Sequence, residues 1–211
     1  MKITRLLFFA SFIFLYSCEG LFNSAPTVTY SETNLSASFF EEGNSPAPTV
    51  NWGGTQGSFE ITQNIEGLSV NSTNGIVSWT AILSPGMHEF DVLASNSSGQ
   101  VSVPMTIDNA FEGTFTGTYS GSSFFELEFS ADGTLIIRAN SETEPDTGSG
   151  TWILEDDVVT ANYTYDEVGD EYSISANLTQ TASEAALNGN WYVGHDNTDG
   201  SPGGTVEVIL Q

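Results

Sequence analysis

The chain has 211 residues and carries 27 Asp and Glu against three Lys and Arg, a formal net charge of −24 at pH 7. Binding to nucleic-acid phosphates or to anionic lipid headgroups needs clustered Lys and Arg, so this composition excludes both. Hydrophobic residues make up 39% and aromatic residues 12%, which excludes a disordered acidic tail and is enough to build a core.

The first segment, residues 1–17, is typical of a signal peptide. Lys2 and Arg5 form a short positive region ahead of an apolar run at residues 6–15. That run is too short to cross a bilayer as a helix, but its length suits the apolar region of a leader.

The single cysteine of the chain, Cys18, stands directly after this leader. The sequence LYSC at residues 15–18 resembles the lipobox of bacterial lipoproteins. The resemblance implies cleavage before Cys18, acylation of its thiol and its new amino group, and a lipid-anchored tether at residues 18–26. We therefore expect an exported protein held at a bacterial outer membrane or cell surface. The alternative is an ordinary secretory leader followed by an unrelated free thiol.

The remainder of the chain predicts an all-β fold in two domains. Short runs of alternating apolar and polar residues are separated by Gly, Ser, Thr and Asn, and no stretch has a convincing helical period. The length suits two domains, which we place at residues 27–110 and 111–211.

The first domain is predicted to be a β-sandwich. Trp52 and Trp79 are expected to fill its core, and Asn74-Gly75 is a strong hairpin signal. The domain resembles the putative-Ig modules of bacterial surface proteins, related to the dystroglycan-type cadherin-like domain. The marks that carry this resemblance are Gly67-Leu68-Ser69, Asn74-Gly75, the run at 76–79, Pro85-Gly86, the run at 90–94, residues 96–99 and the run at 101–107.

The second domain is predicted to be a small antiparallel barrel of eight strands, with an open sandwich as the alternative. Closure of so short a set of strands removes exposed edges, and the interior is then filled by side chains or holds one small ligand. Gly113-Thr114-Phe115 stands where lipocalins carry Gly-x-Trp, so the domain resembles a lipocalin-like barrel with Phe in place of Trp. The alternating runs lie at residues 111–119, 125–129, 135–139, 152–154, 159–165, 172–178, 185–193 and 206–210.

Aromatic residues on the inward face of these runs either fill a core or line a ligand cavity. Counting every second residue from the start of each run gives the inward face, and eight of its aromatic residues are the candidates for a ligand lining. They are Phe115, Tyr119, Phe125, Phe129, Trp152, Tyr163, Tyr172 and Trp191.

The turn Ala131-Asp132-Gly133 predicts the register of one hairpin. Pairing the residues that flank it places Glu126 opposite Arg138 on the outer face, as a cross-strand ion pair. The alternative is an inward Arg138 that binds a ligand carboxylate.

Four connections are expected at one rim of the barrel, at residues 120–123, 141–149, 166–170 and 194–204. Clustered carboxylates suit a hard cation, so calcium is the one cofactor that this rim could take, although acidic loops are usually only solvated. The candidate ligands, with His195 beside them, are Glu142, Glu144, Asp146, Asp166, Glu167, Asp170, Asp196 and Asp199.

No catalytic residues are predicted, because the two His fall in different domains and the only Cys is expected to carry lipid. We expect a non-catalytic, lipid-anchored surface protein for binding or adhesion, with the sandwich as a stalk and the barrel presenting acidic loops. Its partners would be the membrane through Cys18 and a glycan, a protein or a small apolar ligand. The alternatives are a lipocalin-like carrier of a small apolar ligand and a structural accessory subunit of an outer-membrane complex.

Overall fold

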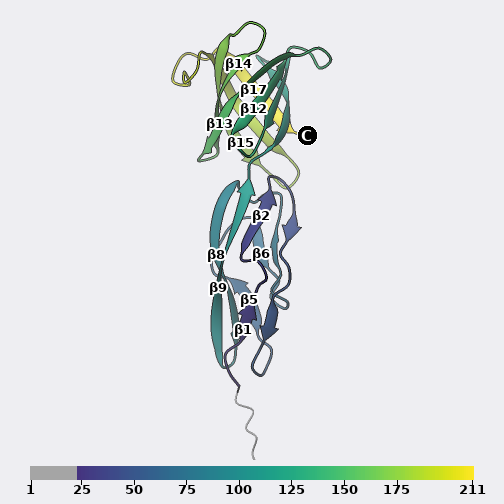
Figure 1. Ribbon diagram of the computed structural model, residues 1–211, viewed down its shortest axis with the longest axis vertical. Helices are drawn as coiled ribbons and strands as arrows, with labels where there is room; N and C mark the ends of the chain where they lie inside the picture. Colours follow the sequence, from purple (N-terminus) through teal and green to yellow (C-terminus); the bar gives the residue numbers. More distant parts are fainter. Residues whose placement is uncertain (1–22) are drawn as a thin grey trace, which may run out of the picture.

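The computed structural model describes residues 23–211, so the predicted leader and Cys18 lie outside the described residues. Strands and turns make up this range, which confirms the all-β class. Figure 1 shows two bodies placed end to end along the long axis, the earlier strands in one and the later strands in the other. In this part of the chain, no helix is long and apolar enough to cross a membrane.

The first body contains nine strands in three sheets. A four-stranded sheet has the order β2-β9-β8-β5, a three-stranded sheet has the order β3-β7-β6, and β1 pairs with β4. The strands are β1 (Thr27–Thr29), β2 (Asn34–Ser38), β3 (Gly43–Asn44), β4 (Thr49–Asn51), β5 (Ser58–Ile61), β6 (Leu68–Val70), β7 (Val77–Trp79), β8 (Gly86–Asn96) and β9 (Gly99–Ala110).

One hydrophobic core joins these sheets. Phe90, Val92 and Ala94 alternate along β8 and are all buried, because successive strand residues face opposite sides. Trp52 and Trp79 are only half-buried and pack against the margin of this core rather than fill its centre. The predicted Asn74-Gly75 hairpin is present, as β6 and β7 pair antiparallel around the connection at residues 71–76.

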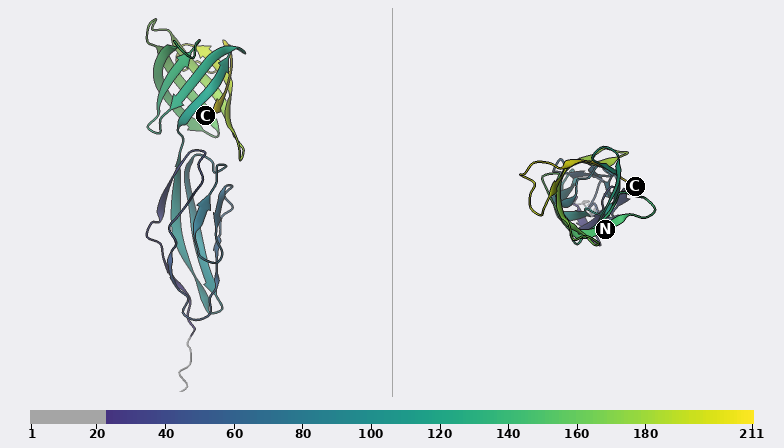
Figure 2. Two further views of the ribbon diagram at one scale, coloured as in Figure 1. Left: turned by 90° about the vertical axis from the view of Figure 1, so that its right-hand side faces the viewer. Right: turned by 90° about the horizontal axis from the view of Figure 1, so that it is seen from above.

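The second body is a closed eight-stranded barrel, which excludes the open sandwich. Each strand pairs antiparallel with the next, and the last strand returns to the first. Figure 2, in its view from above, shows the strands as a ring. They are β10 (Gly113–Tyr119), β11 (Ser123–Phe129), β12 (Thr134–Ala139), β13 (Asp146–Glu155), β14 (Val158–Tyr165), β15 (Glu171–Gln180), β16 (Ala185–Val193) and β17 (Gly204–Leu210).

Inward-facing glycines let the barrel wall curve tightly. A Cβ on Gly117 would lie 2.2 Å from the backbone oxygen of Glu207, and one on Gly150 would lie 1.9 Å from that of Asn162. Contacts this short with backbone leave no room for any side chain, so glycine is required where neighbouring strands approach closely.

The predicted connection at residues 141–149 is wrong at its C-terminal end. Strand β13 begins at Asp146, and Gly148 and Gly150 pair with Ile137 and Leu135 of β12. Glycine and polar residues are typical of loops, but here the glycines occupy inward positions of a strand. Val193, at the end of the predicted run at 185–193, is also 64% exposed rather than part of the core.

The two bodies share a hydrophobic contact. Phe39, directly after β2, is buried in the core of the barrel, and its ring centroid lies 4.9 Å from that of Phe111. On the other side of the junction, Gln180 at the end of β15 donates to the backbone oxygens of Ala81 and Leu83, at 2.7 and 3.1 Å. The lower end of the barrel is therefore closed by residues from both bodies.

Candidate functional site

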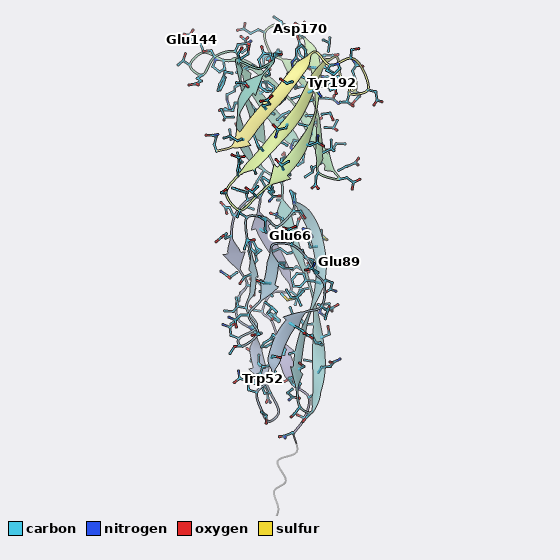
Figure 3. All side chains as sticks on the ribbon, turned by 180° about the vertical axis from the view of Figure 1, so that it is seen from behind. Trp52, Glu66, Glu89, Glu144, Asp170 and Tyr192 are labelled. Atoms are coloured by element: carbon cyan, nitrogen blue, oxygen red, sulfur yellow. The ribbon has the colours of Figure 1, made fainter. Side chains whose placement is uncertain are left out.

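The barrel has a cavity of about 430 Å³ at the end farthest from the first body, which we call the sandwich. We call it the aromatic cup. Figure 3 places Glu144 and Asp170 at this end and Trp52 at the opposite end of the molecule. The cup is lined by Tyr119, Phe125, Asn140, Asp146, Thr147, Tyr163, Tyr165, Glu167, Val168, Asp170, Tyr172 and Trp191.

The rings that line the cup form a closed circuit of contacts. Tyr163 stacks on Tyr172 at an interplanar angle of 24°, whereas Tyr172 meets Trp191 nearly edge-on at 72°. Such edge-on and offset contacts are the arrangements that aromatic pairs prefer. Centroid distances of 5.3 to 6.4 Å connect Tyr119, Phe125, Tyr163, Tyr172 and Trp191 in turn and lead back to Tyr119.

The strand register explains why space remains between these rings. Phe125 on β11 lies opposite Gly117 on β10 and Ala139 on β12, so a large ring faces two small neighbours. Tyr163 and Tyr172 are direct cross-strand partners on β14 and β15, which sets their stacking.

Burial raises the pKa of two phenols of the cup, Tyr163 and Tyr165. It raises the pKa of Tyr163 well above its usual range, and nearby tyrosines add to the effect. Burial is also the main cause that raises the pKa of Tyr165 to about 12, with Asp146 contributing. A phenol is protonated at neutral pH even at its ordinary pKa, so these two hydroxyls can both donate and accept hydrogen bonds there.

The eight predicted aromatic residues divide between the two ends of the barrel. Tyr119, Phe125, Tyr163, Tyr172 and Trp191 line the cup. The other three, Phe115, Phe129 and Trp152, pack with Phe39 and Phe111 and fill the lower core.

Three of the predicted acidic residues line the cup, and all three are exposed, which places them at its mouth: Asp146, Glu167 and Asp170. Asn140 connects Asp146 to the ring circuit, because its side chain donates to Asp146 and accepts a 2.5 Å hydrogen bond from the Tyr119 hydroxyl. One predicted carboxylate is thus joined to the aromatic lining.

The other predicted acids lie elsewhere. Asp166 accepts a 2.7 Å hydrogen bond from Thr147, and Glu142, Glu144 and Asp199 are exposed in the β12–β13 and β16–β17 loops. Asp196 makes two hydrogen bonds with Asn162 on the outer face of β14: its carboxylate accepts from the Asn162 amide, and its backbone N–H donates to the Asn162 side-chain oxygen. Within residues 23–211 no three Asp, Glu, His or Cys side chains are arranged to hold a metal ion, so calcium binding stays a prediction.

His195 lies on the outside of the barrel. Its Nε2 is 3.1 Å from the backbone oxygen of Tyr163 and 3.2 Å from the Thr164 hydroxyl. A carbonyl oxygen only accepts, so Nε2 donates its proton there and is not available as a base for the hydroxyl. This His attaches the β16–β17 loop to β14.

Arg138 takes the predicted outward position. It pairs with Glu126 across the β11–β12 hairpin, at 2.7 Å, and with Glu128, which was not predicted, at 2.8 Å. Hydrogen bonds to Glu128 and Glu126 raise the pKa of the guanidinium. The alternative of an inward Arg138 that binds a ligand is therefore wrong.

Several residues of the cup were not among the predicted site residues. Tyr165 lies on the same inward face as Tyr163, so the alternation could have identified it. Asn140 has a left-handed backbone, with φ of 69°, in the turn after β12, and no pattern marked it. Val168 lies in the connection between β14 and β15. Thr147 lies at the start of β13, which the sequence had predicted as part of a loop.

Comparison with protein-family models and with curated proteins gave no match. Among solved structures, the chain is similar to a quinonprotein alcohol dehydrogenase-like protein from Bacteroides thetaiotaomicron, with 8% identity and a TM-score of 0.31. The match covers 80% of this chain and 57% of that structure. A likeness this distant carries no argument about activity.

Proposed function

We propose that the protein is a non-catalytic binding module, held at a bacterial cell surface by lipid on Cys18, whose barrel binds a small ligand in the aromatic cup. The observation that carries this proposal is the cup itself, a cavity of about 430 Å³ lined by six aromatic side chains at the end of a closed barrel. Its volume falls within the range of small-molecule pockets, and mostly apolar linings with a few polar groups are typical of them.

The direction of the chain supports a stalk that holds the cup away from a membrane. Ser24, near the first described residue, bonds to Gly53 and Asn96 at the end of the sandwich that lies away from the barrel. Figure 1 shows the far end of the barrel, whose residues line the cup, at the opposite end of the long axis. A lipid on Cys18 would then leave a sandwich, Ig-like by resemblance, between the membrane and the cup.

Binding is a better explanation than catalysis for the groups at this site. His195 is attached to the outer wall, and the carboxylates of the cup lie at its mouth rather than among the deeper rings. A general acid or base needs a group whose pKa is tuned toward the working pH, whereas burial moves the pKa of Tyr163 and of Tyr165 farther from it.

Ligand-observed saturation-transfer NMR with a panel of small aromatic and polar compounds tests the cup. Trp191→Ala removes one wall, whereas Tyr192→Ala removes a neighbouring large ring from the opposite face of β16 and serves as the matched control. We expect transfer to bound compounds in the wild type and the control, and its loss in Trp191→Ala. Absence of transfer to any compound, or unchanged transfer in Trp191→Ala, would contradict the proposal.

A further inference from the structure

We propose that the ligand of the aromatic cup is an organic cation, an alkylated ammonium group that inserts between the rings while carboxylates at the mouth neutralise it. This inference rests on the proposed binding function and adds the chemical class of the ligand. It joins two observations, the ring circuit inside the cup and the uncompensated negative charge at its entrance.

The entrance carries negative charge without a cation from the protein to balance it. Asp146, Glu167 and Asp170 line the cup, and no Lys or Arg does. Within residues 23–211, Arg138 is the one Lys or Arg, and it is held by Glu126 and Glu128 on the outer wall. A ligand with a carboxylate or phosphate would therefore meet three like charges, whereas a cation would be attracted to them.

The interior suits a weakly hydrated cation better than a metal ion. The face of an aromatic ring carries partial negative charge, and alkylated ammonium groups are bound within cages of such rings. Here the edge-on and stacked rings of Tyr119, Tyr163, Tyr172 and Trp191 surround one space from different directions. A hard metal cation would instead need several converging oxygens, and the described residues provide no such group.

The position of the carboxylates relative to the rings also favours a ligand with both apolar and charged character. Asp146 is linked through Asn140 to the Tyr119 hydroxyl, so a carboxylate stands at the margin of the ring circuit. Glu167 and Asp170 belong to the β14–β15 connection, directly after Tyr165. An alkylated ammonium group could therefore contact ring faces while it remains close to the acids.

Paired titrations separate the charge of the ligand from its shape. Choline and benzyltrimethylammonium are each compared, by calorimetry, with an uncharged isostere in which carbon replaces the ammonium nitrogen. We expect each cation to bind at least about tenfold more tightly than its isostere, since the ring faces attract a desolvated cation and do not attract the neutral isostere in this way. Added NaCl should weaken binding of the cations and leave the isosteres unaffected.

Variants in which a neutral amide replaces a carboxylate identify the carboxylates that contribute to cation binding. Asp170→Asn should weaken binding of the cations severalfold and leave the isosteres unchanged. Glu144→Gln removes the same charge from an exposed position at the same end of the barrel but outside the cup, and it should have little effect.

The outcomes distinguish this inference from the proposed function beneath it. If the isosteres or other neutral compounds bind as tightly as the cations, the proposal of a cationic ligand is wrong and the proposed binding function stands. Tighter binding of anionic compounds than of the cations would also overturn the proposal of a cationic ligand. If no compound binds in either the titrations or the NMR panel, the proposed function itself fails.

Discussion

Phe39 of the sandwich and Phe111 at the start of the barrel pack with ring centroids 4.9 Å apart, inside the lower end of the barrel. The Phe39 ring also stacks on that of Phe115, with centroids 6.3 Å apart, and the Phe39 residue is 4% exposed. A side chain that precedes the barrel by more than 70 residues is thus part of its core. The stability of the barrel should depend on this contact with the other body.

Phe39→Ala should therefore destabilise the barrel as a core substitution does. Removing a buried Phe costs about 3–5 kcal/mol, and urea denaturation followed by tryptophan fluorescence would measure the loss. Phe40→Ala is the matched control, because Phe40 is adjacent but only partly buried against the same core. Equal losses for the two variants would show that Phe39 contributes no more than a peripheral contact.

Strand faces in the barrel could be predicted because alternation has a period of two and one face is buried. The hairpin at residues 130–134 shows this best, because its turn predicted the pairing of Glu126 with Arg138 and this pair is present. The Gly133 backbone, with φ of +87°, allows this turn, so local chemistry and burial agree.

Contacts between distant segments could not be predicted from one sequence. Nothing near Phe39 in the chain indicates that it enters the barrel, and nothing near Asp196 indicates its bonds to Asn162. The acidic loops were expected to gather at one rim, but whether a loop carboxylate turns toward the cup or the outer wall depends on such bonds. The cup itself depends on which end of the barrel Phe39 and Phe111 fill.

The proposed lipid anchor would be attached to the Cys18 thiol, which lies outside the described residues. Metabolic labelling with an alkyne fatty acid should mark the wild-type chain and move it to the membrane fraction, because several acyl chains give stable anchoring. Cys18→Ser should remove both the label and the membrane association. Ser17→Ala, which keeps the thiol, is the control, and loss of label in that variant as well would point to failed export.

The buried phenols predict loss of stability at alkaline pH. Burial raises the pKa of Tyr165 in the cup and of Tyr30 in the sandwich from 10.0 to about 12. Because the folded pKa lies above the unfolded value, this stabilisation is complete below pH 10 and is lost as pH rises toward about 12. The urea midpoint should therefore fall across this interval. Tyrosinate absorbance of the folded protein should appear at a higher pH than that of the unfolded chain.

Phenylalanine variants test whether these particular hydroxyls cause the alkaline loss. Tyr165→Phe keeps the ring and removes the ionisable proton, so its urea midpoint should fall less steeply between pH 10 and 12 than that of the wild type. Tyr30→Phe should do the same, although it also loses the 2.5 Å hydrogen bond to the Gly75 backbone oxygen and should start from a lower midpoint. The slope against pH is the decisive measurement, because a missing hydrogen bond lowers the whole curve whereas a missing phenol flattens it. Parallel curves for the wild type and Tyr165→Phe would mean that water reaches the Tyr165 hydroxyl freely and that the cup is wetter than its aromatic lining indicates.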